Sequence, residues 1–134
     1  ICIGINDVWR QYDSPAIPDE HVSPQEYEKN LEKMILLVKG QVKGIFLLTP
    51  YYMEPNKADW MRGRMDEYGA VCERLSQKHD CILVNLQEAF NRYFKYRHSS
   101  YIAWDRVHPN QIGATIVARE FLKHCDFTYD HLPE

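Results

Sequence analysis

The sequence predicts an α/β domain in which helices cover a parallel β-sheet. Short apolar runs without polar alternation are typical of strands buried on both faces, and such runs occur at residues 1–5, 45–48 and 81–86. The segments around them carry apolar residues at spacings of three and four, as amphipathic helices do. Strands that alternate with helices favour a parallel sheet. The expected order is β–α–β–α–β–α–α in a single domain, residues 1–134.

The first strand is expected at residues 1–5 and the first helix directly after Ser23. Ser23 suits the N-cap of that helix, Pro24 its first turn and Gly40 its C-terminal stop. Its inward face is expected to carry Tyr27, Leu31, Met34, Ile35 and Val38. The stretch between strand and helix, 9–22, contains two prolines and is expected to be a loop that shapes a pocket.

Three more helices are predicted, at about 58–78, 87–97 and 109–124. Apolar side chains at helical spacing mark the buried side of the last two: Phe90, Phe94, Ile112, Ile116 and Phe121. The remaining tail, 126–134, is expected to be loose, as chain ends commonly are.

Charge and composition exclude several classes of protein. The net charge is −3, and Lys and Arg are scattered, so no basic stripe is present to hold a nucleic acid. No apolar run approaches the roughly 20 residues that span a bilayer. The histidines lack metal-ligand spacing, and the cysteines form no CxxC pair. We therefore expect neither a metal nor a cofactor, and we expect Cys2, Cys72, Cys81 and Cys125 to be reduced thiols in the core.

Polar residues stand where the predicted strands end, which is where parallel sheets place their chemistry. Asn6 and Asp7 follow the first strand in the motif GIND. A second motif, DRVHPN at 105–110, lies just before the last helix. One turn can bring the Asp105 carboxylate to the His108 imidazole, which would fix the tautomer of a general base.

Together, GIND and DRVHPN, in this order and about a hundred residues apart, resemble the third and fifth sequence blocks of the SGNH hydrolases, also called GDSL esterases/lipases. The resemblance extends over essentially the whole chain. It implies a flavodoxin-like three-layer α/β/α fold, of which the predicted strands would be the last three. It also implies an esterase or acylhydrolase.

The resemblance assigns a role to three residues. His108 corresponds to the base that activates a serine, and Asp105 to the residue that orients this base. Asn6 corresponds to the amide donor of the oxyanion hole. Three aromatic residues lie close in sequence to the strand ends or to the histidine, and we expect them to contact substrate: Trp9, Tyr51 and Trp104.

The serine itself has no counterpart in this sequence. In the family it lies in a GDS block at the end of the first strand, and a second block supplies a Gly oxyanion donor. None of the five serines follows a predicted strand in a Gly-Asp-Ser setting: Ser14, Ser23, Ser76, Ser99 and Ser100. We therefore expect the nucleophile to lie upstream of Ile1, the 134 residues to be the C-terminal part of a larger enzyme, and the chain alone to be inactive.

The expected partner is a small ester, with a short acyl group on a carbohydrate or another small alcohol. A non-catalytic α/β binding module that retains Asp105 and His108 is the main alternative. A nucleotide or flavin binder would need a phosphate loop after a strand, and none is visible in the sequence. The cysteine pattern leans towards a cytoplasmic protein.

Overall fold

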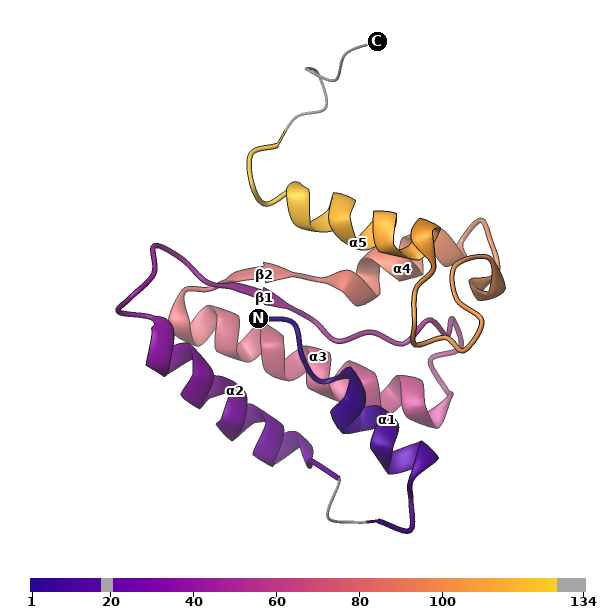
Figure 1. Ribbon diagram of the computed structural model, residues 1–134, viewed down its shortest axis with the longest axis horizontal. Helices are drawn as coiled ribbons and strands as arrows, with labels where there is room; N and C mark the ends of the chain where they lie inside the picture. Colours follow the sequence, from indigo (N-terminus) through magenta and orange to yellow (C-terminus); the bar gives the residue numbers. More distant parts are fainter. Residues whose placement is uncertain (18–20, 128–134) are drawn as a thin grey trace.

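The computed structural model describes residues 1–17 and 21–127 and places a short parallel sheet between two layers of helices (Figure 1). The strands are β1 (Phe46–Leu48) and β2 (Ile82–Val84). The layer below them in Figure 1 contains α1 (Ile5–Asp13), α2 (Pro24–Val38) and α3 (Trp60–His79). The layer above contains α4 (Leu86–Phe94) and α5 (Gln111–Leu122), and a 3₁₀ turn, η2 (Ser99–Tyr101), connects them. The three-layer α/β arrangement predicted from the sequence is confirmed.

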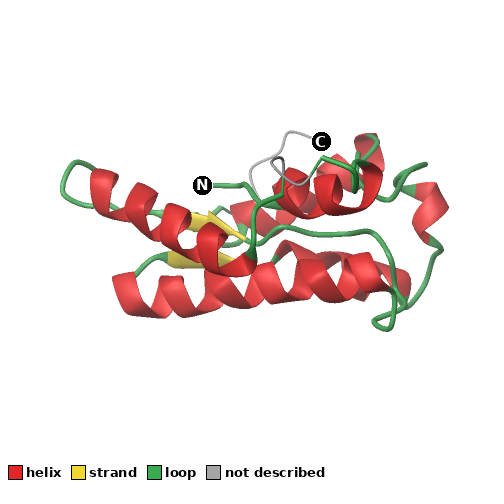
Figure 2. Ribbon diagram, turned by 90° about the horizontal axis from the view of Figure 1, so that it is seen from below, coloured by secondary structure: helices red, strands yellow, loops and turns green. Residues whose placement is uncertain are grey.

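The sheet is parallel, as predicted, but its first strand is shorter than expected. β1 pairs with β2 in parallel register, Phe46 opposite Ile82. The chain start lies on the other side of β1, where Cys2 forms an isolated parallel bridge with Leu48. The Leu48 N–H donates to the Ile1 carbonyl at 2.9 Å. The prediction of a strand over residues 1–5 is therefore wrong beyond this bridge, because a helix begins at Ile5. Figure 2 shows how short the two strands are beside the helices.

Gly4 causes that change of direction. Its φ of 114° lies in the left-handed region that only glycine adopts readily. A Cβ at this position would stand 3.0 Å from the Tyr27 hydroxyl oxygen and 3.2 Å from Pro50 Cγ. The chain can therefore turn here into α1, which buries Val8 completely. The expected loop over 9–22 is thus helical as far as Asp13, and its residues 18–20 lie outside the described residues.

Helix α2 begins as predicted, with the Ser23 hydroxyl accepting a hydrogen bond from Glu26 N–H at 3.1 Å. Its buried stripe is narrower than expected, however. Tyr27, Leu31 and Ile35 are buried at steps of four residues and pack towards α3. Met34 and Val38, expected on the same face, are exposed to 40% and 36%, because they flank that stripe.

Three helix starts are set by capping side chains rather than by the apolar pattern. The caps are Asp59 for α3, Asn85 for α4 and Asn110 for α5, and each accepts hydrogen bonds from N–H groups of the first turn. Asp and Asn are among the best N-cap residues. As a consequence Leu86 belongs to α4 instead of a strand, and Pro109 lies outside α5 instead of opening it.

Helix α5 is less buried than its apolar sequence predicts. Ile112 is 53% exposed, and Gly113 is the only residue of α5 that is buried. Ile116 and Phe121 are half-buried, and the Phe121 ring lies 4.9 Å from that of Phe46. The prediction that Ile112 is buried is therefore wrong, and Ile116 and Phe121 are only partly buried.

The four cysteines are unpaired, but they do not all lie in the core. Cys72 is buried, and burial raises the pKa of its thiol to about 11. Cys81 is half-buried, whereas Cys2 and Cys125 are exposed. The prediction of four core thiols therefore holds in full only for Cys72. Most of the tail that we expected to be loose, 128–134, lies outside the described residues.

Glycine 113 supplies a stability test of the contact between α5 and the loop before it. A Cβ there would lie 2.7 Å from Pro109 Cβ and 3.0 Å from the Ile102 carbonyl oxygen. We expect Gly113→Ala to lower the free energy of unfolding by about 1 to 3 kcal/mol in urea titrations, because the backbone must shift. Gly63→Ala is the control: nothing lies within 4 Å of that position in α3, so alanine should raise stability by roughly 0.5 to 1 kcal/mol. Equal effects at both positions would contradict this account.

Candidate active site

The turn that carries the DRVHPN motif brings Asp105 and His108 into direct contact. Asp105 Oδ2 lies 2.6 Å from His108 Nδ1. Asp105 Oδ1 accepts hydrogen bonds from the N–H groups of Val107, at 3.0 Å, and His108, at 2.8 Å. The Asp105 side chain is 16% exposed and that of His108 is 60% exposed. The arrangement leaves the other imidazole nitrogen, Nε2, available to take up a proton when Nδ1 donates to the carboxylate.

The loop around the pair is fixed at several points. Arg106 adopts a left-handed backbone with φ of 63°, which is uncommon for a residue with a side chain. Val107 is buried and belongs to the main core cluster. Asn110 closes the loop, since its N–H donates to the Ile102 carbonyl at 2.7 Å and its amide donates to the Tyr101 carbonyl at 2.9 Å. His108 is therefore exposed but held on both sides.

The hydrogen bonds to Asp105 determine its charge state. Burial acts to raise the pKa of this carboxyl group, but the hydrogen bonds from the His108 side chain and from two backbone N–H groups outweigh it and lower the pKa to about 2. Asp105 is thus a carboxylate at any neutral pH. A fixed negative charge beside Nδ1 stabilises the imidazolium that forms when the base takes up a proton.

Helix α1 borders the histidine from another side. The Trp9 and His108 rings meet edge to face, with centroids 5.5 Å apart. Asn6 lies three residues before Trp9 on the same helix, and side chains at this spacing share a face. Asn6 is exposed and forms no side-chain hydrogen bond with any residue that the structure describes. Its role as an oxyanion donor stays a prediction, with the correction that it projects from the first turn of α1 instead of a strand end.

The other two expected substrate contacts differ in their surroundings. Trp104 directly precedes Asp105 and is 88% exposed. Tyr51 packs against Phe90, with ring centroids 4.8 Å apart, and burial raises the pKa of its hydroxyl to about 12. Trp104 is thus accessible beside the dyad, whereas Tyr51 is largely a packing residue.

The five serines all lie in described residues, and none has a hydrogen bond to His108. Ser99 is buried in η2, and the Ser100 hydroxyl pairs with His98 Nδ1 at 2.9 Å. Ser23 and Ser76 form local hydrogen bonds at α2 and within α3, and Ser14 ends α1. None of the five hydroxyls is therefore paired with His108 in this structure.

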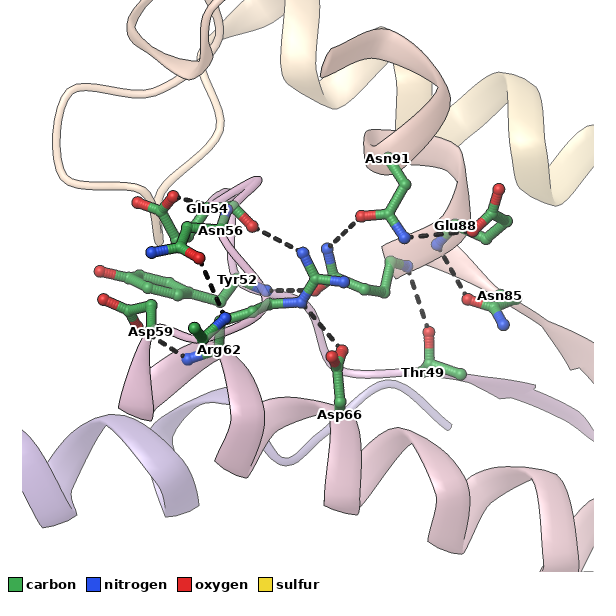
Figure 3. Close-up of polar contacts among 12 residues, drawn as sticks. Thr49, Tyr52, Glu54, Asn56, Asp59, Arg62, Asp66, Asn85, Glu88 and Asn91 are labelled. Atoms are coloured by element: carbon green, nitrogen blue, oxygen red, sulfur yellow. Dashed lines mark hydrogen bonds and ion pairs between the residues drawn. The ribbon is translucent and has the colours of Figure 1, made fainter. Parts of the chain in front are cut away.

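Sequence reasoning missed a polar network that supports the dyad loop. It connects Arg62 on α3, Glu54 in the loop after β1 and Arg106, and Figure 3 shows its inner part around Arg62. Arg62 is 1% exposed, although arginine is rarely buried. The only signal in the sequence was a position on the inward face of α3, between Met61 and Met65.

A cavity of about 200 Å³ lies beside this network, lined by residues of α3 and α4 that include Arg62, Asp66 and Asn91. Within residues 1–17 and 21–127, no group of three or more His, Cys, Asp or Glu is placed to hold a metal ion. No helix in the same ranges is long and apolar enough to cross a membrane.

An exposed imidazole held by a carboxylate beside a parallel α/β sheet is an arrangement found in hydrolases that use a histidine base. The family model of the GDSL-like lipases/acylhydrolases matches residues 1–116. The chain belongs to this family, as its sequence motifs predicted.

Similar proteins are esterases and related hydrolases. An acetylxylan esterase of Geobacillus stearothermophilus is 46% identical over 129 residues, which cover 96% of this chain and 59% of that enzyme. The structure of a mutant of its acetyl-xylooligosaccharide esterase, Axe2, superposes with a TM-score of 0.96 at 44% identity, over 99% of this chain and 61% of the enzyme. An α/β hydrolase from the metagenome of Lake Arreo gives a TM-score of 0.91 at 48% identity, over 95% of this chain and 59% of its own. The chain thus spans about three-fifths of the length of these relatives.

The lowered pKa of Asp105 makes its contribution to stability dependent on pH. Because the folded-state pKa of about 2 lies below the ordinary value of 3.8, the ionised carboxylate stabilises the fold above about pH 4, and the effect is lost as the pH falls towards 2. We expect Asp105→Asn to lower the free energy of unfolding by about 1 to 2 kcal/mol at pH 7, allowing for solvent screening. Urea titrations from pH 7 to 2 should show this difference disappear, and a constant difference would contradict the assignment.

Proposed function

We propose that this chain carries the base half of the active site of a carboxylic ester hydrolase that removes acetyl groups from xylan-type carbohydrates. The observation that carries the proposal is the contact between Asp105 and His108 at 2.6 Å, on an exposed loop held at both ends. The acetylxylan esterase relative supports the substrate class. Solved structures of Axe2 include catalytic mutants in which a Ser, an Asp or a His is replaced by Ala, which are the residue types that this mechanism needs.

In the proposed reaction, a serine hydroxyl oxygen attacks the acetyl carbonyl carbon while His108 Nε2 takes up the serine proton. Asp105 stabilises the resulting imidazolium through Nδ1. The Asn6 amide donates to the oxygen on which negative charge develops. When the intermediate collapses, the bond between the acetyl carbon and the sugar oxygen breaks, and His108 gives its proton to that oxygen. His108 then takes a proton from a water molecule that attacks the acetyl-serine ester, and it returns this proton to the serine oxygen as acetate leaves.

We infer that the serine lies outside residues 1–134. None of the five serines of the chain has a hydrogen bond to His108 in the structure, and the sequence spans 59% of the acetylxylan esterase that it resembles. On this proposal the 134 residues alone have no esterase activity. Exposed Trp104 beside the dyad and Trp9 against the imidazole supply aromatic surface suited to a sugar ring.

The role of His108 as base predicts the result of labelling with a fluorophosphonate probe. In the protein that includes the preceding residues, we expect a single adduct on a serine upstream of Ile1, located by peptide mapping. His108→Ala should abolish labelling and lower kcat for an aryl acetate by several orders of magnitude, because the serine is no longer deprotonated.

His98→Ala is the matched control, since His98 is also exposed and pairs with a serine, Ser100, but lies outside the dyad. It should label and turn over like the parent. No adduct on a longer, folded protein would favour the non-catalytic binding module. Near-parent activity in His108→Ala would exclude its role as base.

Asn6 is expected to act only on the transition state. Asn6→Ala should lower kcat about 10²- to 10³-fold with little change in KM, the typical effect of losing one oxyanion donor. Steady-state kinetics on an aryl acetate measure this. Asn30→Ala removes another exposed amide, on α2, and should leave kcat unchanged. A raised KM at constant kcat in Asn6→Ala would instead make Asn6 a ground-state contact.

A further inference from the structure

Arg62 is the buried centre of a network that extends from α3 to the loop of the dyad. Its Nε donates to Asp66 Oδ1 at 2.9 Å, and its Nη1 donates to the main-chain carbonyl of Glu54 at 2.6 Å. Figure 3 shows the guanidinium between these two acceptors, with Asp59 capping the same helix turn. A buried guanidinium stays in place only when its donors are satisfied. The position of the Glu54 backbone is therefore fixed from inside the protein.

The side chain of Glu54 links this fixed backbone to Arg106. One carboxylate oxygen, Oε1, accepts a hydrogen bond from Asn56 N–H at 2.8 Å. The other forms an ion pair with the Arg106 guanidinium, which also lies 5.9 Å from the Tyr52 ring centroid. The Glu54 side chain is 14% exposed and that of Arg106 is 46% exposed, so the pair is partly shielded from solvent.

Arg106 is held by its backbone as well as by its side chain. Its carbonyl accepts a hydrogen bond from Met53 N–H at 2.8 Å. Met53 therefore holds the backbone of Arg106, and Glu54 holds its side chain. The left-handed backbone of Arg106 directs the N–H groups of Val107 and His108 towards Asp105 Oδ1. Such a conformation persists only when the surroundings enforce it.

We propose that Glu54 is a positioning residue for the catalytic pair, acting through Arg106 and held in place by Arg62. This inference rests on the proposed function, because it makes Glu54 act on the geometry of Asp105 and His108. Glu54 touches neither of them. Without its carboxylate, the Arg106 side chain loses its anchor, the left-handed turn loosens, and the hydrogen bonds that Asp105 accepts lengthen.

The test compares Glu54→Gln, Arg106→Ala and the double variant. Alanine and arginine both carry a Cβ, so Arg106→Ala removes the side chain and leaves the backbone strain unchanged. We use these positions because removing buried Arg62 would leave polar partners unpaired and could unfold the chain. One readout is the pKa of the Asp105 carboxyl group, followed through the ¹³C shift of its carboxyl carbon in the protein that includes the residues before Ile1. The other is kcat and KM for an aryl acetate in the protein that includes the nucleophile.

The matched control is Glu120→Gln. Glu120 pairs with Arg92 between α4 and α5, and the two side chains are 13% and 44% exposed, close to the values for Glu54 and Arg106. We expect this variant to leave both readouts unchanged. If the ion pair of Glu54 with Arg106 were only structural, Glu54→Gln and Glu120→Gln should have the same effect on the Asp105 pKa and on kcat.

In Glu54→Gln the pKa of Asp105 should rise from about 2 towards its ordinary value, and kcat should fall roughly tenfold at constant KM, as for a displaced catalytic group. The double variant should be no worse than the worse single variant, because both substitutions break one connection. An unchanged Asp105 pKa with unchanged kcat, or additive losses, would overturn the proposal. If wild-type protein hydrolyses no ester, the proposed function fails, while the NMR measurement still decides whether Glu54 positions Asp105.

Discussion

The carboxylate of Asp105 is the constraint around which the candidate site is organised. It accepts hydrogen bonds from two backbone N–H groups and contacts the imidazole of His108. The turn that makes these contacts has a left-handed backbone at Arg106, a conformation that persists only when neighbouring contacts hold it. The buried Val107 provides one support, and the segment 53–54 provides the other. The core contact of Val107 and the loop after β1 therefore both stabilise the four-residue turn 105–108.

The layers of the fold were predictable because they depend on patterns that repeat along the chain. Apolar runs and helical spacing predicted six of the seven main elements close to their observed places, the exception being α1. Failures arose where a single residue overrides the pattern. Gly4 ends the first strand early and allows α1, which the two prolines downstream had made look like a loop. The caps Asn85 and Asn110 move helix starts by one or two residues because side-chain oxygens satisfy N–H groups locally.

The site was predictable to the extent that its residues are close in sequence. The contact between Asp105 and His108 follows from a spacing of three, so the motif alone predicts it. Glu54 and Arg62 were not predictable, because Glu54 meets Arg106 only through the tertiary fold and Arg62 acts on the Glu54 backbone. A buried arginine also reads in sequence as an exposed one, since composition and periodicity do not reveal where its partners lie.

Contacts within the motif and contacts that form only in the folded chain both orient His108. Among the described residues, four features hold His108 in its orientation: the carboxylate, the left-handed residue beside it, the segment that holds that residue and the amide that closes the loop. His108 is therefore oriented by contacts within the described residues. In a parallel α/β sheet, strand ends from different parts of the chain meet at one edge, which is how Met53, after β1, comes to hold the carbonyl of Arg106. The bridge from Cys2 to Leu48 fixes the start of the chain against β1, and it thereby helps to place α1, whose Trp9 packs against the imidazole.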